Sequence, residues 1–437
     1  MNAVNPASEH ATPAPFDHDV IIVGAGPVGL ALAGWLAQRS ATSSLSVALI
    51  DAREPEDSVS DPRAIAVSQG SRTLLQALAW PQDATSIERI HVSQRGHFGR
   101  TLIDRHDYDL PALGYVARYG VIVQSLAQAV RGTNVHWLHH THAQEPVVEH
   151  DGVTLQVETA GVARTLRARI LVNAEGGLYR VQTPKADVAP QEAAQPQDEA
   201  DRGAPQDSPQ SSPQPAPQSA QKRTRDYGQT ALVGVVSVSA PQAHVAWERF
   251  TDEGPIALLP MGGARDADFA LVWCSAPVEA ARRAALSDAD FLAELGNAFG
   301  ARMGRFTQIR GRAAFPLGLN ALDTLVSGQG RIAAVGNAAQ TLHPVAGQGL
   351  NLGLRDAHAL ADALAQHGAT PLALADFAGR RAVDRRMTIG ATDTLARLFT
   401  VDFPALATLR GLALTALEFV PPLKTALARQ MMFGQRS

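Results

Sequence analysis

The glycines at 24, 26 and 29 constrain the fold of this chain more than any other feature of its sequence. They follow a run of β-branched residues, 19–23, that is typical of a buried strand, and they precede an apolar stretch, 30–36, that is typical of a helix. In such a unit Gly24 permits the tight turn, Gly26 lets the backbone approach a phosphate group and Gly29 lets the helix pack closely. The free N–H groups and positive dipole end of the helix N-terminus then face the phosphate. We therefore predict a phosphate-binding turn.

A second strand is expected over 45–50, and it ends at an acid, Asp51, about 20 residues beyond the last glycine. A carboxylate at that place accepts hydrogen bonds from the hydroxyl groups of a ribose. The glycine turn alone could be no more than a tight connection, but strand, helix and acid agree on dinucleotide binding. The apolar run 20–37 approaches the length of a membrane-spanning helix, yet its four glycines and one proline argue against that alternative. We predict the adenosine half of a dinucleotide here.

A second glycine-rich segment, 336–351, follows an expected strand over 331–335. Asn337 places a short polar side chain at the strand end, where it can hydrogen-bond the ribityl or pyrophosphate part of a dinucleotide. The run Gly347, Gln348, Gly349 opens an expected helix, whose N-terminus can stabilise negative charge on a reduced flavin ring. Pro344 favours an extended turn and leaves space above that ring. Because FAD is a dinucleotide long enough to need both segments, we predict that the chain binds FAD.

Composition bounds the class of protein. A chain of 437 residues with 45% hydrophobic and 18% charged residues suits a globular protein of two or more domains. Its net charge of −4 makes nucleic acid an unexpected partner. The single cysteine, Cys274, excludes an intrachain disulfide and a multi-thiolate metal site, and we expect it to be buried and inert. Residues 1–16 have no secretory signal, so we expect a cytoplasmic protein. We also expect no bound metal.

The predicted fold is α/β, with a discontinuous Rossmann-like FAD-binding domain, an inserted mixed-sheet substrate domain and a helical C-terminus. Residues 185–225 are rich in Pro, Gln, Ala and Ser and should form a disordered insertion, although a partner-binding role for the Pro-Gln tract is the alternative. The expected divisions are a flexible tail (1–18), an FAD-binding domain (19–79, 109–184 and 321–370), a substrate domain (80–108 and 226–320), the insertion (185–225) and C-terminal helices (371–437).

The chain resembles the flavin-dependent aromatic hydroxylases built on the p-hydroxybenzoate hydroxylase fold. Four motifs carry the resemblance together, at 24–29, 61–68, 173–177 and 336–351. Segments 90–99, 226–231 and 410–424 are most similar to the ubiquinone-biosynthesis hydroxylases, in the 2-polyprenyl-6-methoxyphenol hydroxylase branch. The resemblance runs from Asp19 to the C-terminus apart from the insertion.

This resemblance implies roles for further residues. Arg63 and Gln124 should contact the ribityl–pyrophosphate part of FAD, although Arg63 could also be a solvated loop charge. Asn351, at the end of the fourth motif, should belong to the cofactor site. The stretch 174–176 should lie beside the flavin and nicotinamide paths.

Three positions depart from the family pattern. Glu175 stands where the family has Asp, Asn337 replaces Asp, and Gln340 occupies a position often held by His. Asn337 still accepts a hydrogen bond, so cofactor binding should survive the loss of one negative charge.

The chemistry implied by the resemblance is reduction of FAD by NAD(P)H, formation of a flavin C4a-hydroperoxide with O2, and transfer of a hydroxyl group to a polyprenylated phenol in ubiquinone biosynthesis. NAD(P)H should bind transiently, because a single dinucleotide fingerprint is visible. A phenol reacts better as phenolate, which calls for a general base. We name His343 as the candidate catalytic residue and Tyr227 as another, with a structural role for His343 as the alternative.

Other functions stay open. The chain could be a flavin-dependent hydroxylase or reductase acting on another lipophilic or aromatic substrate, or a non-catalytic flavin- or lipid-binding component of a biosynthetic complex. The apolar C-terminal run 403–420 either packs on the body of the protein or touches a membrane surface or partner protein, which would place the protein at the inner face of a membrane.

Overall fold

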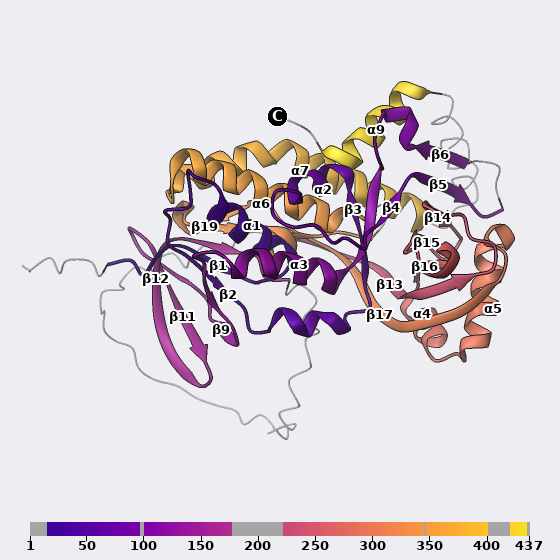
Figure 1. The fold of residues 1–437 in the computed structure, drawn as a ribbon, viewed down its shortest axis with the longest axis horizontal. Coiled ribbons are helices and arrows are strands. Elements are labelled where there is room, and N and C mark those ends of the chain that lie inside the picture. The colour runs from indigo at the N-terminus through magenta and orange to yellow at the C-terminus, as the bar shows by residue number, and fades with distance from the viewer. Residues whose placement is uncertain (1–14, 97–99, 177–221, 345–346, 401–419, 435–437) are drawn as a thin grey trace, which may run out of the picture.

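A computed structural model describes residues 15–96, 100–176, 222–344, 347–400 and 420–434. This part of the chain forms two large sheets, a small sheet and a layer of long helices (Figure 1). The first sheet has a parallel centre in which β1 lies between β2 and β12. The parallel strands, in spatial order, are β8 (His136–Leu138), β2 (Val47–Ile50), β1 (His18–Val23), β12 (Val162–Asn173) and β19 (Ile332–Ala334).

The central strand β1 is apolar on both faces because both faces are covered. Val20 and Ile22 pack into a helical layer, whereas Ile21 and Val23 pack against antiparallel strands on the opposite face. The helices of that layer are α1 (Pro27–Gln38), α3 (Tyr119–Arg131) and α6 (Gln348–His367). The antiparallel additions to the sheet are β9 (Thr141–Ala143), β10 (Val147–Val148), β11 (Val153–Thr159) and β18 (Val326–Ser327).

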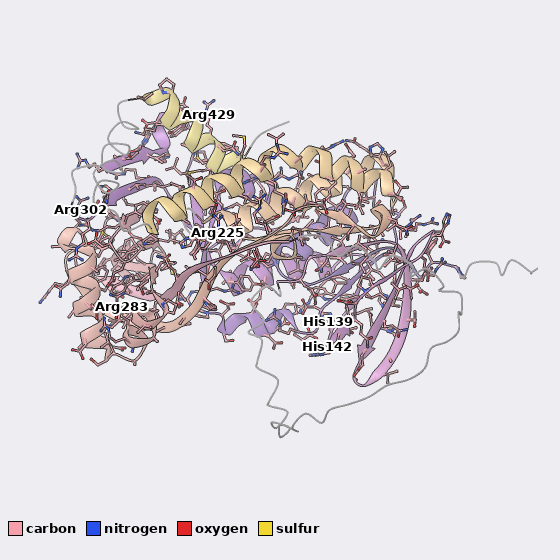
Figure 2. The ribbon with its side chains drawn as sticks, turned by 180° about the vertical axis from the view of Figure 1, so that it is seen from behind. His139, His142, Arg225, Arg283, Arg302 and Arg429 are labelled. Carbon is pink, nitrogen blue, oxygen red and sulfur yellow. The ribbon has the colours of Figure 1, made fainter. Side chains whose placement is uncertain are left out.

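The second sheet has eight strands among the described residues, and two helices cover one of its faces. In spatial order they are β20 (Gln340–Thr341), β17 (Phe306–Leu322), β13 (Lys222–Val238), β16 (Asp268–Ser275), β15 (Pro255–Pro260), β14 (Val245–Phe250), β5 (Arg89–Gln94) and β6 (Arg100–Asp104). The outer face, which includes Trp273, packs on α4 (Pro277–Ala284) and α5 (Asp288–Phe299). Figure 2 shows Arg283 and Arg302 on this side of the molecule.

The inner face of the second sheet points toward the FAD-binding part of the chain. Ala246 of β14 belongs to one apolar cluster with Ala64 and Ala66 of a small three-stranded sheet. The strands of this small sheet are β3 (Ala64–Ser68), β7 (Gly114–Arg118) and β4 (Thr85–Ile87), and α2 (Gln69–Leu75) follows β3. The inner face therefore borders the region between the two large sheets.

The helical layer continues into the C-terminal part of the chain. Helix α7 (Pro371–Thr400) lies along α6, and α9 (Pro421–Phe433) reaches back to α2 (Figure 1). Buried charges join α6 and α7, because Arg381 pairs with both Asp356 and Asp384, and Arg355 pairs with Asp384. Among the described residues, none of the helices combines the length and the hydropathy that a membrane-spanning segment requires.

Several sequence expectations are confirmed, and others need correction. The predicted α/β class, the discontinuous cofactor domain, the mixed sheet and the C-terminal helices are confirmed, and Cys274 is buried. The tail was expected to be flexible to 18, but Phe16 stacks on Arg167 and Arg169, and β1 begins at His18. The expected insertion ends too late, because β13 begins at Lys222. Most of that insertion and the run 403–419 lie outside the described residues.

Candidate functional site

Close packing in the turn after β1 accounts for two of the three glycines, Gly24 and Gly29. Gly24 has φ +107°, and a Cβ there would lie 2.7 Å from the backbone of Ala174 at the end of β12. A Cβ on Gly29 would lie 1.9 Å from the carbonyl oxygen of Gly24. Both distances are far shorter than van der Waals contact, so these positions admit only glycine. The turn, the start of α1 and the end of β12 are thereby held against one another.

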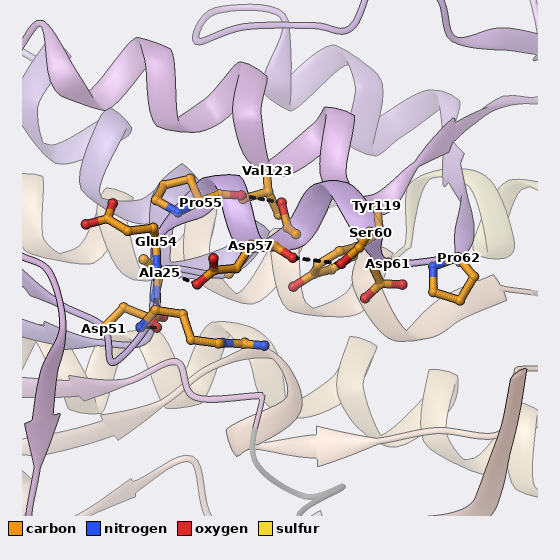
Figure 3. Close-up of a pocket in the computed structure, with 13 residues that line it drawn as sticks. Ala25, Asp51, Glu54, Pro55, Asp57, Ser60, Asp61, Pro62, Tyr119 and Val123 are labelled. Carbon is orange, nitrogen blue, oxygen red and sulfur yellow. Dashed lines mark hydrogen bonds between the residues drawn. The ribbon is translucent and has the colours of Figure 1, made fainter. Parts of the chain in front are cut away.

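Gly26 differs from these two because it faces open space. A Cβ there would meet only the hydroxyl oxygen of Tyr119, at 3.5 Å. Gly26 is the N-cap of α1 and has no side chain to cap the N–H groups of the first turn. A pocket of about 320 Å³ opens beside it (Figure 3). The pocket is lined by the turn, the end of β2, residues 53–62 and the start of α3. An anionic group can therefore meet the helix N-terminus here, as the pyrophosphate of FAD would.

Asp51 lies at the end of β2, on the wall of this pocket (Figure 3). Its Oδ2 accepts a hydrogen bond from the N–H of Ala25 at 2.6 Å, and its Oδ1 accepts one from the N–H of Arg53 at 2.8 Å. A carboxylate has about four lone-pair sites, so two remain for other donors. Asp51 thus fixes the glycine turn, and contact with a ribose stays a prediction.

Arg63 is held in a fixed position next to Asp61 and Pro62, which line the pocket. Its Nη2 donates to Asp61 Oδ2 at 2.6 Å, and its guanidinium lies 4.5 Å from the ring centre of Tyr119. Burial alone would raise the pKa of Asp61, but hydrogen bonds from Arg63 outweigh it and lower the pKa. The guanidinium also approaches the ring of Phe315, on β17 of the second sheet. Arg63 thus links the two domains, and its contact with FAD stays a prediction.

Gln124 is exposed on α3 and is not among the residues that line the pocket. Its neighbour Val123 does line the pocket, so the predicted contact of Gln124 with FAD requires an approach from outside that wall.

The second glycine segment packs directly on the first. Gly336 has φ +62°, and a Cβ there would lie 3.1 Å from the side chain of Val28 in α1. A Cβ on Gly353 of α6 would lie 2.8 Å from the Cα of Gly336. The half-buried Asn337 lies in the 3-10 turn η7 (Gly336–Ala338), close to the start of α1. The structure thus brings together the two segments that the sequence separates by about 300 residues.

The start of α6 is anchored to β3. Asn351 Oδ1 accepts the N–H of Ser68 at 2.8 Å, and its Nδ2 donates to the carbonyl oxygens of Ala66 and Gly347 at 3.0 and 2.7 Å. Gly347 has φ +60° and packs on Ala66. Asn351 therefore positions the loop before α6 through backbone contacts, and direct contact with FAD stays a prediction.

The first residues of α6 differ in accessibility. Gln348 is buried, and its Nε2 donates to the carbonyl oxygen of Met431 in α9 at 3.2 Å. A Cβ on Gly349 would meet nothing within 4 Å, so a ligand can approach the backbone there. Pro344 is half-buried before this turn, and its carbonyl oxygen accepts the N–H of Gly347 at 2.9 Å.

His343 is 1% exposed and contacts the second sheet. Its Nε2 lies 3.1 Å from Oε1 of Gln229, whose Nε2 donates to the carbonyl oxygen of Glu253. Its ring meets the ring of Tyr227 edge-on, and the Tyr227 hydroxyl donates to Asp393 at 3.1 Å. Burial lowers the pKa of His343 to about 4, so the imidazole is neutral near pH 7. These contacts favour the structural alternative, and a catalytic role stays a prediction.

Of the family departures, Gln340 has a local explanation, and Glu175 makes a contact through its backbone. Gln340 is buried, its Nε2 donates to Asp356 Oδ2 at 2.8 Å, and its Oε1 accepts from Arg385 at 2.7 Å, so it bridges the buried charges of α6 and α7. Glu175 is exposed, and its N–H donates to Oδ1 of Asn173 at 2.9 Å.

Replacing Asp51 with alanine should weaken FAD binding by about tenfold to a hundredfold, because a hydrogen bond to a charged group contributes about 1.5–3 kcal/mol. The N–H of Ala25 would lose its partner and the turn its anchor. Titration of apoprotein with FAD, followed by flavin fluorescence, measures the effect. Asp83→Ala, which removes an exposed carboxylate, is the matched control. Equal affinities for D51A and D83A would contradict the prediction.

Some residues near the site were not expected from the sequence. Tyr119 and Phe315 contact Arg63 from two different domains, and β14 was missed altogether. The aromatic residues gave no periodic signal, and their proximity to Arg63 depends on long-range packing.

The comparisons with known proteins agree with this geometry. The sequence profile of a protein family described as FAD binding domain matches residues 17–190 and 213–375. An uncharacterized protein of Synechocystis is 32% identical over 430 residues, which cover 95% of this chain and 93% of that protein. A ubiquinone hydroxylase of Rhodospirillum rubrum is 31% identical over 95% of this chain and 89% of its own length, and the 3-demethoxyubiquinol 3-hydroxylase of Escherichia coli is 29% identical over 93% and 96%. The crystal structure of p-nitrophenol 4-monooxygenase from Pseudomonas putida DLL-E4 superposes with a TM-score of 0.69 at 15% identity, over 96% of this chain and 99% of that chain, which shows a shared fold.

Proposed function

Because the chain belongs to the FAD binding domain family, we propose that it is an FAD-dependent monooxygenase that hydroxylates a lipophilic, polyprenylated phenol in ubiquinone biosynthesis. The observation that carries the proposal is that the second glycine segment packs on α1, with Gly336 against Val28, and that the N-terminus of α1 borders the pocket at Gly26 and Asp51. A long dinucleotide can lie along these elements, with its adenosine half at Asp51 and its flavin half at α6. Two relatives, named as a ubiquinone hydroxylase (31% identity) and a 3-demethoxyubiquinol 3-hydroxylase (29% identity), support the substrate class.

In this proposal the residues of the chain bind and orient the reactants. The N-terminus of α1 holds the pyrophosphate, and the N-terminus of α6 faces the flavin. FAD, once bound, supplies the redox chemistry with NAD(P)H and O2 as transient co-substrates. The inner face of the second sheet lies across from the flavin region and presents the phenol, while its apolar side chains exclude water.

The test uses purified protein loaded with FAD and a phenol that carries a short prenyl chain ortho to its hydroxyl group. We expect the phenol to accelerate NAD(P)H oxidation and to yield a hydroxylated product that contains one oxygen atom from ¹⁸O₂, detected by mass spectrometry. NAD(P)H oxidation without a hydroxylated product would contradict the monooxygenase proposal. Complementation of quinone-deficient cells, with identification of the accumulated intermediate, would test the pathway.

A further inference from the structure

We propose that Glu248 accepts the proton of the phenolic hydroxyl group of the substrate, an assignment that rests on the proposed function. The O–H bond of the phenol breaks, its electron pair stays on the phenolate oxygen, and a carboxyl O–H bond forms on Glu248. The proton returns to solvent after product formation. The step moves one proton and changes no oxidation state.

The position of Glu248 follows from the alternation of side chains along β14. Trp247 lies in the outer cluster with α5, and Ala246 lies in the inner cluster with β3, so Glu248 points to the inner face. Register pairs Glu248 with Ala257 of β15 and with Val92 of β5. The carboxylate is therefore on the sheet face that borders the flavin region.

Contacts connect this position to the second glycine segment from two directions. On one side, Ala246 shares its cluster with Ala66, on which Gly347 packs before α6. On the other side, the charge of Glu248 acts on the thiol of Cys274. The carbonyl oxygen of Cys274 lies close to Gly254, where a Cβ would be 2.6 Å from it.

The second path continues from Gly254 to the loop that precedes α6. The same Cβ on Gly254 would lie 3.0 Å from Gln229 Nε2, and Gln229 Oε1 contacts His343. Chains of contacts that start from two neighbours of Glu248, Ala246 and Cys274, therefore lead to this loop.

The carboxylate has no partner among the described side chains. No hydrogen bond or ion pair joins it to any of them. The residue is half-buried, so a ligand can approach it from the accessible part of its surface. A buried charge without a partner is costly, so a donor from a ligand would satisfy it.

No charged group described near Glu248 donates to its carboxylate. Arg249, the next residue, belongs to the outer face, where its guanidinium lies near the end of α5. The positive charges of Arg302 and Arg95 repel that of Arg249. On the inner face, Cys274 is the titratable neighbour among the described residues, and burial followed by the charge of Glu248 raises the pKa of its thiol. Burial raises the pKa of Glu248 to about 7. A carboxylate with this pKa is a stronger base than an exposed one and is ionised above pH 7.

The experiment compares wild type with Glu248→Gln in the hydroxylation of the short-chain prenylphenol across pH 5 to 9. Wild-type kcat/KM should rise with pH through about 7, as the carboxylate forms. E248Q should lose about 10²- to 10⁴-fold in kcat/KM and should lack this rise. FAD content and the rate of flavin reduction without phenol should stay unchanged. Glu248→Asp should keep the pH dependence at intermediate activity, and Glu158→Gln, an exposed glutamate on β11, is the matched control.

Thermal unfolding gives a readout that does not depend on activity. The folded-state pKa of Glu248 is raised above its unfolded value, so the folded protein loses stability as pH rises from about 4.5 to about 7. E248Q should therefore melt above wild type at pH 8, and the difference should shrink toward pH 5. A partner for the carboxylate would give the opposite order at pH 8.

The outcomes separate the two proposals. Hydroxylation by wild type together with unchanged kcat/KM and pH profile in E248Q would overturn the role of Glu248 and leave the proposed function intact. Failure of wild type to hydroxylate the phenol would overturn the proposed function, and the role of Glu248 with it.

Discussion

Replacing Gly29 with alanine should strongly destabilise the fold and leave the protein without bound FAD. The new Cβ would lie 1.9 Å from the carbonyl oxygen of Gly24, which is backbone and cannot rotate away. The turn would have to shift, and Gly24 itself is confined by Ala174 at 2.7 Å. Overpacking of this kind costs about 3 kcal/mol or more. We expect colourless, poorly soluble protein with a lowered thermal midpoint.

Gly26→Ala separates folding from cofactor binding in the same turn. Its Cβ would meet only the Tyr119 hydroxyl, at 3.5 Å, so the protein should fold. The methyl group would point into the space where we place the pyrophosphate, and FAD affinity should fall by about tenfold to a hundredfold, a cost of about 1–3 kcal/mol.

The flavin absorbance of purified protein and the thermal midpoint measure the two effects. Gly132→Ala, at the open C-terminal end of α3, is the matched control for both variants. A G29A protein that carries FAD and melts like wild type would show that the turn is not packed as described. A G26A protein with wild-type affinity for FAD would remove the pyrophosphate from this position.

How far the sequence predicts this molecule depends on how local each signal is. Gly24, Gly26, Gly29 and Asp51 were predicted correctly as one strand–turn–helix unit and a strand end, because each acts within a few residues of a regular element. Helix α5 (Asp288–Phe299) follows signals of the same local kind, since its apolar spacing is regular and Ser287 caps it.

Strand β14 was missed for a physical reason. Three apolar residues, 245–247, are followed by Glu248 and Arg249, so the strand lacks the alternation that predicts a sheet. Each charge points to a face that also carries an apolar cluster. Departures from the alternating pattern of a strand are expected at functional positions rather than at random ones.

The sequence also could not show which predicted residues contact the cofactor and which hold the loops. Asn351 was expected in the cofactor site, and its amide is engaged with the backbone of β3 and of Gly347. Gln340 stood out as a departure at the site, and it bridges buried charges instead. Apart from the contact of Asn351 with Gly347, these roles depend on pairings between residues 16 to 285 positions apart, which no local pattern encodes.

Replacing Asp384 with alanine should destabilise the helical layer that carries the flavin end of the site. Asp384 is 2% exposed and accepts hydrogen bonds from Arg355 at 2.9 Å, from Arg381 and from Gln430 of α9 at 3.1 Å. Without Asp384, Asp356 would be the one carboxylate of this cluster that is left to balance the two buried guanidinium groups of Arg355 and Arg381. Removing one partner of a buried ion pair costs about 3–5 kcal/mol, because the remaining charge is left uncompensated.

We expect the thermal midpoint of D384A to fall by roughly 10 °C, measured by circular dichroism and by release of flavin fluorescence on heating. The two signals should move together, because α6 both belongs to the charged cluster and begins at the proposed flavin position. Asp362→Ala is the matched control on α6, since it removes a half-exposed pair with Arg39 that contributes less than about 1 kcal/mol. A D384A midpoint within about 2 °C of D362A would mean that α6 and α7 are held by their apolar contacts and not by these charges.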